Sequence, residues 1–178
     1  MTQWQHVVII PYKWLISGIE CMLLLTGEYE HTIDDKGRVL VSNKLRNQID
    51  VDEHGGNFYL VVGANGILCL YPEKCFERLS VAMAQKNAAP DETVAFERMN
   101  FALAGKVELD SQGRLLLTEK LRKRAGLKDN VTLVGVRDHI ELWNTPDWEQ
   151  YVADNMAQFQ KRVAQVRQEV LQKQNQDV

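Results

Sequence analysis

The chain has 178 residues, with 21 Lys and Arg against 24 Asp and Glu, which gives a formal net charge of −3. Hydrophobic residues make up 45% and charged residues 25%, the balance of an ordinary globular protein. This composition excludes a wholly disordered chain, a low-complexity chain and a polybasic coat for nucleic acid.

The N-terminal region contains the most apolar stretch of the chain, residues 7–25. An export signal has a basic start and an unbroken apolar run, and a membrane-spanning helix needs about 20 apolar residues with few charges. Here no Lys or Arg precedes the stretch, and Pro11, Lys13 and Glu20 interrupt it. We therefore expect residues 1–22 to be a poorly ordered extension and not a membrane anchor.

Regular patterning begins after this extension. Polar and apolar residues alternate over residues 28–33, which predicts a half-buried strand. The DDKG sequence at 34–37 predicts a turn, because Asp bonds local backbone amides and Gly accepts a positive φ. A second strand over 38–41, a short helix capped by Ser42 and a strand pair over 58–71 are expected to follow.

The same order of segments occurs twice. Residues 34–49 (DDKGRVLVSNKLRNQI) recur at 110–125 (DSQGRLLLTEKLRKRA), with seven of sixteen positions identical. Random pairing at ordinary composition gives about one identity. The strand pair at 58–71 has its counterpart at 131–143. In the second copy, Thr118 takes the helix-capping position.

The repeat defines the expected organisation. We expect half-domains at 28–76 and 106–149, each with strands, a short helix and a closing helix. Units this small bury little apolar surface alone, so the two should pack as one pseudo-symmetric α+β domain with a mixed β core and flanking helices. Residues 77–104 are predicted to be a helical connector, broken into two helices at Pro90.

The C-terminal region, residues 150–178, is expected to be an amphipathic helix and a frayed tail. Its apolar residues recur at intervals of three or four, as one helix face requires. They are Val152, Met156, Phe159, Val163, Val166 and Val170. Packing on the helix's own domain and binding to a partner chain are both compatible with this pattern.

The sequence shows no pattern of a catalytic or cofactor site. It lacks a local nucleophile–histidine arrangement, an HExxH or similar metal-ligand spacing, and a Gly-rich phosphate loop. Cys21, Cys69 and Cys75 form an odd set without a CxxC pair, which argues against a disulfide framework and a zinc site and fits a reducing cytoplasm. We expect no enzyme activity, cofactor, metal ion or small-molecule substrate. His31 lies on the inward side of the first strand and is expected to be a hydrogen-bonded core histidine.

The spacing DxxxR occurs once in each copy, across each predicted turn. A single occurrence is explained by an Asp that caps the turn and an Arg that pairs with it. Two occurrences on pseudo-symmetric turns also predict matched side chains that can bind phosphates or base edges of DNA. The predicted DNA contacts are Lys36, Arg38, Gln112 and Arg114, and the predicted turn-shaping residues are Asp34, Gly37, Asp110 and Gly113.

The net charge around each turn supports this interpretation, although the net charge of the whole chain is negative. Segment 34–46 carries a net charge of +2 and segment 106–124 a net charge of +3. One modest basic patch binds DNA weakly, so useful affinity implies several copies of the chain on an oligomer.

The repeated segments, together with LVG and ELW in the second copy, resemble the MraZ family over about residues 23–150. These bacterial transcriptional regulators are built from two SpoVT-AbrB-like domains. The resemblance implies a tandem swapped-hairpin-like fold that assembles into a ring of several subunits. It also implies a repressor, in the cytoplasm or nucleoid, that binds short direct repeats in double-stranded DNA upstream of a division and cell-wall gene cluster. By position, the DNA-contacting motif of the family falls on residues 34–38 and 110–114.

Three features depart from the family pattern. Ser42 and Thr118 stand where the family usually has Pro, the turn of the second copy (DSQG) carries Gln112 where a Lys-bearing turn is usual, and the N-terminal extension has no counterpart. A second class of function also stays open, that of a protein-interaction module such as an antitoxin-like partner protein. In that case the helix after Trp148 would dock another chain, and DNA binding would be absent.

Overall fold

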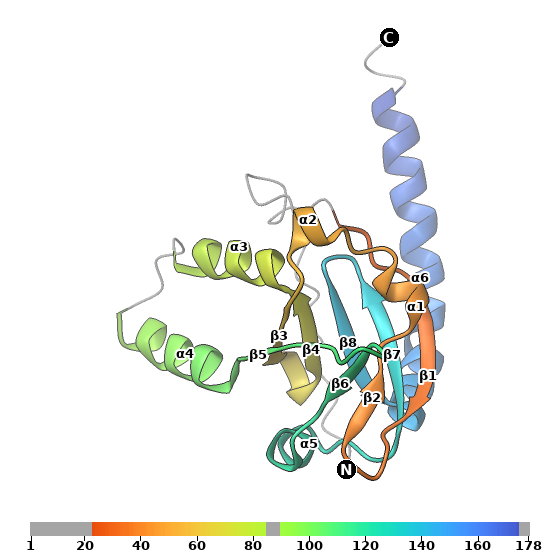
Figure 1. Cartoon of the computed structure of the whole chain (residues 1–178). Coiled ribbons are helices and arrows are strands. Elements are labelled where there is room, and N and C mark those ends of the chain that lie inside the picture. The colour runs from red at the N-terminus through yellow and green to blue at the C-terminus, as the bar shows by residue number, and fades with distance from the viewer. Residues whose placement is uncertain (1–22, 85–89, 175–178) are drawn as a thin grey trace.

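The computed structural model describes residues 23–84 and 90–174 (Figure 1). The expectation for residues 1–22 lies outside the described residues. The first copy contains β1 (Glu28–Thr32), β2 (Arg38–Leu40), α1 (Asn43–Arg46), α2 (Val51–His54), β3 (Phe58–Val62), the 3-10 turn η2 (Ala64–Gly66) and β4 (Leu68–Pro72). The connector forms α3 (Glu73–Ala84) and α4 (Pro90–Leu103). The second copy contains β5 (Gly105–Val107), β6 (Arg114–Leu116), α5 (Glu119–Ala125), β7 (Asn130–Val136) and β8 (His139–Asn144), and α6 (Thr145–Gln174) follows.

The two copies exchange strands in a six-stranded sheet of order β1-β7-β8-β4-β3-β5. The first strand of each copy pairs with a hairpin strand of the other copy, β1 with β7 and β5 with β3. The two hairpins meet where β4 pairs with β8. Each copy therefore completes the sheet of the other. The α+β class is confirmed. The expectation of a mixed β core is wrong, because the strand pairings in the described sheet are all antiparallel.

A second, two-stranded sheet joins the copies again, and we call it the ribbon (β2 and β6). Its strands are antiparallel, with Val39 opposite Leu115. Both of these side chains are fully buried and belong to the main hydrophobic core. The core thus lies between the ribbon and the six-stranded sheet. It includes Leu45, Leu60, Leu70, Leu133, Ile140 and Leu142.

Two short helices begin at the capping residues that the sequence predicts. The Ser42 side chain accepts a hydrogen bond from the backbone of α1, and the Thr118 side chain accepts one from the backbone of α5. Gly126 ends α5 in the left-handed conformation, with φ of 61°. The loop between α1 and β3 holds an unexpected helical turn, α2. Asp50 caps it by accepting hydrogen bonds from the backbone amides of Asp52 and Glu53.

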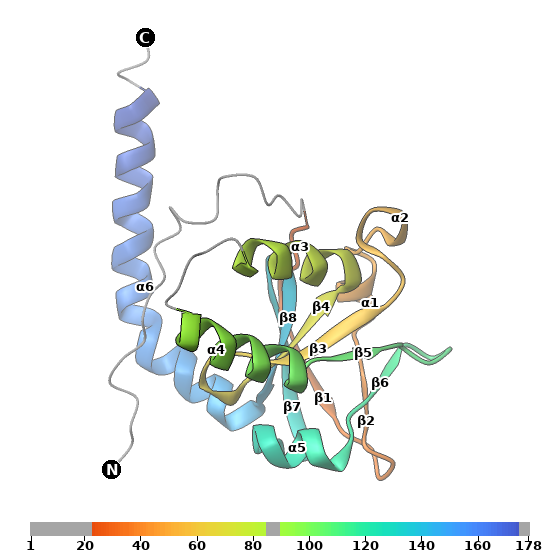
Figure 2. The ribbon, with the colours of Figure 1, turned by 90° about the vertical axis from the view of Figure 1, so that its left-hand side faces the viewer.

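The connector is helical as expected, and α3 begins at Glu73, earlier than the predicted boundary. The first turns of α6 pack on β7 and β8, where Trp143, Trp148 and Tyr151 form an aromatic cluster. The rest of α6 extends away from the body (Figure 2). Among the helices of residues 23–84 and 90–174, none combines the length and apolar character needed to span a bilayer.

The expectation for His31 is wrong in part. This side chain lies on the inward side of β1, but it is only partly buried and its Nε2 atom is buried without a hydrogen-bond partner. The pairing of β1 with β7 of the other copy, which sequence patterning does not reveal, determines these surroundings.

The register of the ribbon predicts unequal losses of stability at two neighbouring leucines. Leu115→Ala removes a fully buried side chain and should lower the free energy of unfolding by about 2–5 kcal/mol. Leu116→Ala removes a side chain that is 54% exposed and should cost less than about 0.5 kcal/mol. Chemical denaturation of the two variants measures both values, and equal losses would contradict the register.

Candidate nucleic-acid interface

The turn between β1 and β2 is organised by one carboxylate. Asp34 Oδ1 accepts hydrogen bonds from the backbone amides of Lys36 (3.0 Å) and Arg38 (2.8 Å). Asp34 Oδ2 accepts from Nε (2.8 Å) and lies 2.7 Å from Nη2 of Arg38. Gly37 has a φ of 75°, and a Cβ there would come within 2.8 Å of the Leu117 carbonyl oxygen. The Asp34 carboxylate thus closes the turn through one oxygen and orients the Arg38 guanidinium through the other.

The turn between β5 and β6 repeats this arrangement. Asp110 Oδ1 accepts hydrogen bonds from the backbone amides of Gln112 and Arg114, both at 2.9 Å. Asp110 Oδ2 accepts from Nε (2.8 Å) and lies 2.7 Å from Nη2 of Arg114. Gly113 has a φ of 77°. The two turns are therefore equivalent contact by contact, as the repeat predicted.

The ribbon brings the two arginines to one face. Arg38 pairs with Leu116 and Arg114 pairs with Leu40, so the arginines are diagonal neighbours. Diagonal positions of this kind are about 7–8 Å apart between Cα atoms. Because side chains alternate along a strand, these four side chains lie opposite the buried face that holds Val39. The turns lie at opposite ends of the ribbon, since its strands are antiparallel.

Each guanidinium remains partly accessible, with 27% of its side chain exposed. The pairing with Asp uses two of the five N–H donors of an arginine. Within the described part of the chain, neither Arg38 nor Arg114 has another hydrogen-bond acceptor. The outer N–H groups are therefore available to a ligand, while Lys36 and Gln112 lie exposed at the tips of the turns.

Asp34 with Arg38 and Asp110 with Arg114 form ion pairs, and the charge of one pair acts on the other. The side-chain hydrogen bond from Arg38 holds the pKa of Asp34 below its ordinary value. The equivalent bond from Arg114 lowers the pKa of Asp110 to about 2. Asp34 raises the pKa of Arg38, and the charge of Asp110 adds to this effect. The two turns thus belong to one electrostatic unit.

Sequence reasoning missed two contributions to this surface. Leu40 and Leu116 share the face of the arginines and are 38% and 54% exposed. Arg46 of α1 donates through Nε to the Val41 carbonyl oxygen, and its guanidinium fills the space beside Gly113 of the other copy. The alternation of strand residues could have indicated the leucines, whereas the contact of Arg46 depends on the exchange of strands.

Comparison with known proteins identifies the family. The sequence profile described as "MraZ protein, putative antitoxin-like" matches residues 24–99 and 101–169. The chain belongs to the MraZ family. The two matched segments correspond to the two copies of the repeat, so the resemblance drawn from the doubled turn is confirmed.

Relatives in the family match most of the chain. A protein of Finegoldia magna named "Transcriptional regulator MraZ" is 35% identical over 136 residues, 76% of this chain and 92% of the relative. A protein of the same name from Pediococcus pentosaceus is 33% identical over the same shares of both chains. Another from Caldicellulosiruptor saccharolyticus is 33% identical over 147 residues, 83% of this chain and 99% of the relative. Transcriptional regulators are not a class of enzyme.

The Asp110–Arg114 pair predicts a measurable pH dependence. Because the folded state lowers the pKa of Asp110 from 3.8 to about 2, the pair stabilises the second turn above about pH 4. This contribution disappears as the pH falls towards 2. Arg114→Gln should raise the pKa of Asp110 towards its ordinary value, and an NMR titration of the carboxyl carbon measures it. An unchanged pKa in that variant would show that Arg114 does not cause the shift.

Proposed function

We propose that this chain is a transcription regulator that binds specific sequences in double-stranded DNA and has no enzyme activity. The observation that carries the proposal is the pair of equivalent Asp-held arginines on one exposed face of the ribbon. Arg38 and Arg114 are the leading base contacts, with Lys36 and Gln112 beside them. Asp34, Gly37, Asp110 and Gly113 shape the turns.

The geometry of each pair favours base reading over simple neutralisation of phosphate. Asp34 cancels much of the charge of Arg38 and holds the edge formed by Nε and Nη2. The guanidinium is then oriented before binding, and its outer N–H groups can donate to O6 and N7 of guanine. Lys36 has no such partner among the described ion pairs and can serve a phosphate.

The neighbouring side chains complete a contact surface for a groove of DNA. Leu40 and Leu116 alternate with the two arginines across the ribbon. Exposed apolar side chains at such positions can contact the methyl group of thymine. Gln112 at the tip of the second turn can bond N6 and N7 of adenine. A two-stranded ribbon of this kind has the width that the major groove admits.

The exchange of strands between the copies supports a SpoVT-AbrB-like, swapped-hairpin-like fold for the two half-domains. The relatives are named transcriptional regulators, and by extension we infer the same role for this chain. The target would be short direct repeats upstream of a division and cell-wall gene cluster. We propose repression as the outcome of binding, in the cytoplasm and at the nucleoid.

Assembly into a ring of several subunits would supply the affinity that one ribbon lacks. Several weakly binding surfaces on one assembly bind repeated DNA sites more tightly than one such surface does alone. The connector helices leave large apolar side chains exposed, as subunit contacts require. They are Val81, Val94, Phe96, Met99 and Phe101, each 47% to 60% exposed.

One observation favours a second candidate, a protein-interaction module. The part of α6 beyond the body exposes Met156, Phe159 and Val166, which are 43%, 62% and 41% exposed. This stripe fits a groove on a partner chain, in the manner of an amphipathic helix. Capture of a stoichiometric partner without salt-dependent DNA binding would support this alternative and contradict the regulator.

The leading proposal is tested by a charge-matched pair of double variants. Arg38→Ala with Arg114→Ala should weaken binding to the DNA upstream of its own gene by at least about 30-fold, because each arginine–base contact contributes about 1–3 kcal/mol. Arg162→Ala with Arg167→Ala removes the same charge from the exposed side of α6 and should change affinity less than about threefold. Fluorescence anisotropy at several salt concentrations measures both.

The same titrations separate base contacts from phosphate contacts. Lys36→Ala should weaken binding to all sequences alike and reduce the slope of log affinity against log salt by about one per bound turn. Equal affinity of the wild type and the Arg38, Arg114 variant, with fold and size unchanged, would remove these residues from the contact surface.

A further inference from the structure

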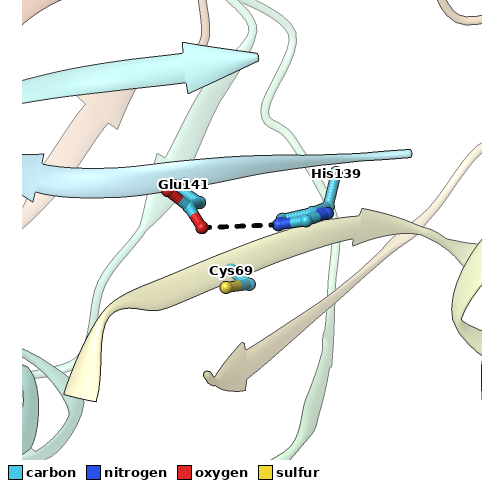
Figure 3. Close-up of side chains that lie close together, drawn as sticks. All are labelled: Cys69, His139 and Glu141. Carbon is cyan, nitrogen blue, oxygen red and sulfur yellow. Dashed lines mark ion pairs between the residues drawn. The ribbon is translucent and has the colours of Figure 1, made fainter. Parts of the chain in front are cut away.

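A cluster of three metal-ligating side chains lies where the hairpins of the two copies meet. Cys69 on β4 pairs with Glu141 on β8. His139 precedes Glu141 by two residues on the same strand, so its side chain shares their face of the sheet. Figure 3 shows the three side chains turned toward one another across the two strands.

The distances within this cluster suit one small cation. The ligand atoms of Cys69, His139 and Glu141 all lie within 4.8 Å of one another. His139 Nε2 and Glu141 Oε1 are 3.6 Å apart. A tetrahedral zinc ion with ordinary bond lengths separates its ligand atoms by about 3.4–3.8 Å. The histidine and glutamate already meet this spacing. Because no two ligand atoms are more than 4.8 Å apart, the sulfur needs a shift of about 1.4 Å at most.

The surroundings hold the ligands as metal sites do. Asp138 Oδ1 lies 2.8 Å from His139 Nδ1, which directs Nε2 of the ring toward the cluster. Trp143 Nε1 donates to Glu141 Oε2 at 2.8 Å, and this leaves Oε1 for a cation. The ring of Tyr71 stacks on His139 with centroids 4.5 Å apart.

The sulfur of Cys69 is shielded from solvent, and there is space beside it. Cys69 is 5% exposed and is not part of a disulfide. Cys75, in contrast, is disulfide-bonded, which the odd number of cysteines in the sequence did not predict. A Cβ at Gly63 would come within 2.7 Å of Cys69 Sγ, so glycine keeps the space beside the sulfur open. Val61 and Phe76 form a small buried cluster with Cys69.

We propose that Cys69, His139 and Glu141 form a binding site for Zn²⁺, with the fourth position left to water. A thiolate, an imidazole and a carboxylate are a donor set that zinc accepts and that hard cations such as Mg²⁺ do not favour. The site lies in the six-stranded sheet, away from the ribbon, and it joins β4 of the first copy to β8 of the second. Bound zinc therefore acts as a clamp between the two copies.

The test uses the full chain without an affinity tag, and zinc and cobalt as probes. Competition with a chromophoric chelator should show one Zn²⁺ bound per chain, and Co²⁺ should give thiolate-to-metal absorption. Cys69→Ala should abolish this absorption, and Cys69→Ala and Glu141→Gln should each weaken Zn²⁺ binding by more than about 100-fold. Asp138→Asn, which removes only the support of His139, should weaken it by about 10–100-fold.

His31→Gln is the matched control, since it removes a histidine of β1 outside the cluster and should leave zinc affinity unchanged. Zinc should also raise the melting temperature of the wild type but not of the Cys69→Ala variant. Wild-type chain that binds less than one Zn²⁺, or binds Co²⁺ without thiolate absorption, would overturn the proposal whatever the folding of the variants. So would full zinc affinity in both the Cys69→Ala and Asp138→Asn variants.

Discussion

Two backbone hydrogen bonds tie the repeated turns to one ribbon. Leu117 donates to the Gly37 carbonyl oxygen at 2.8 Å, and Val41 donates to the Gly113 carbonyl oxygen at 3.0 Å. Each bond crosses from one copy to the other, so the backbone of each turn is bonded to the strand of the other copy. The arrangement needs glycine at residue 37, where a Cβ would collide with the opposing carbonyl. The placement of both arginines on a single face follows from this register.

The structure joins the copies at several places, and we infer different roles for two of them. At the ribbon, paired charges are oriented and remain partly accessible, which is the arrangement that recognition of another polar molecule requires. At the junction of β4 and β8, the buried thiol of Cys69 faces the partly buried side chains of His139 and Glu141, which is the arrangement that holds a cation. The duplicated chain can hold both arrangements because the two copies meet at two separate places, the ribbon and the junction of β4 with β8.

Features encoded in short segments of the sequence were predictable, and those that depend on contacts between the copies were not. The turns at Asp34 and Asp110 follow from local hydrogen bonding, as do the caps at Ser42 and Thr118. The pairing of β1 with β7 and the cluster around Cys69 require knowledge of which strands become neighbours. Strand alternation gives a face for each side chain but not the partner that covers it, so it could not show the antiparallel order or the ligand set.

A photo-crosslinking experiment tests whether the ribbon is the surface that meets DNA. The reactive amino acid replaces Leu40 or Leu116, which lie opposite the arginines on the ribbon, or Phe159 on α6, which is 62% exposed. Each protein is irradiated with the DNA upstream of its own gene. The structure predicts crosslinks from both ribbon positions and none from Phe159. Crosslinks from Phe159 alone, with both ribbon positions silent, would contradict it.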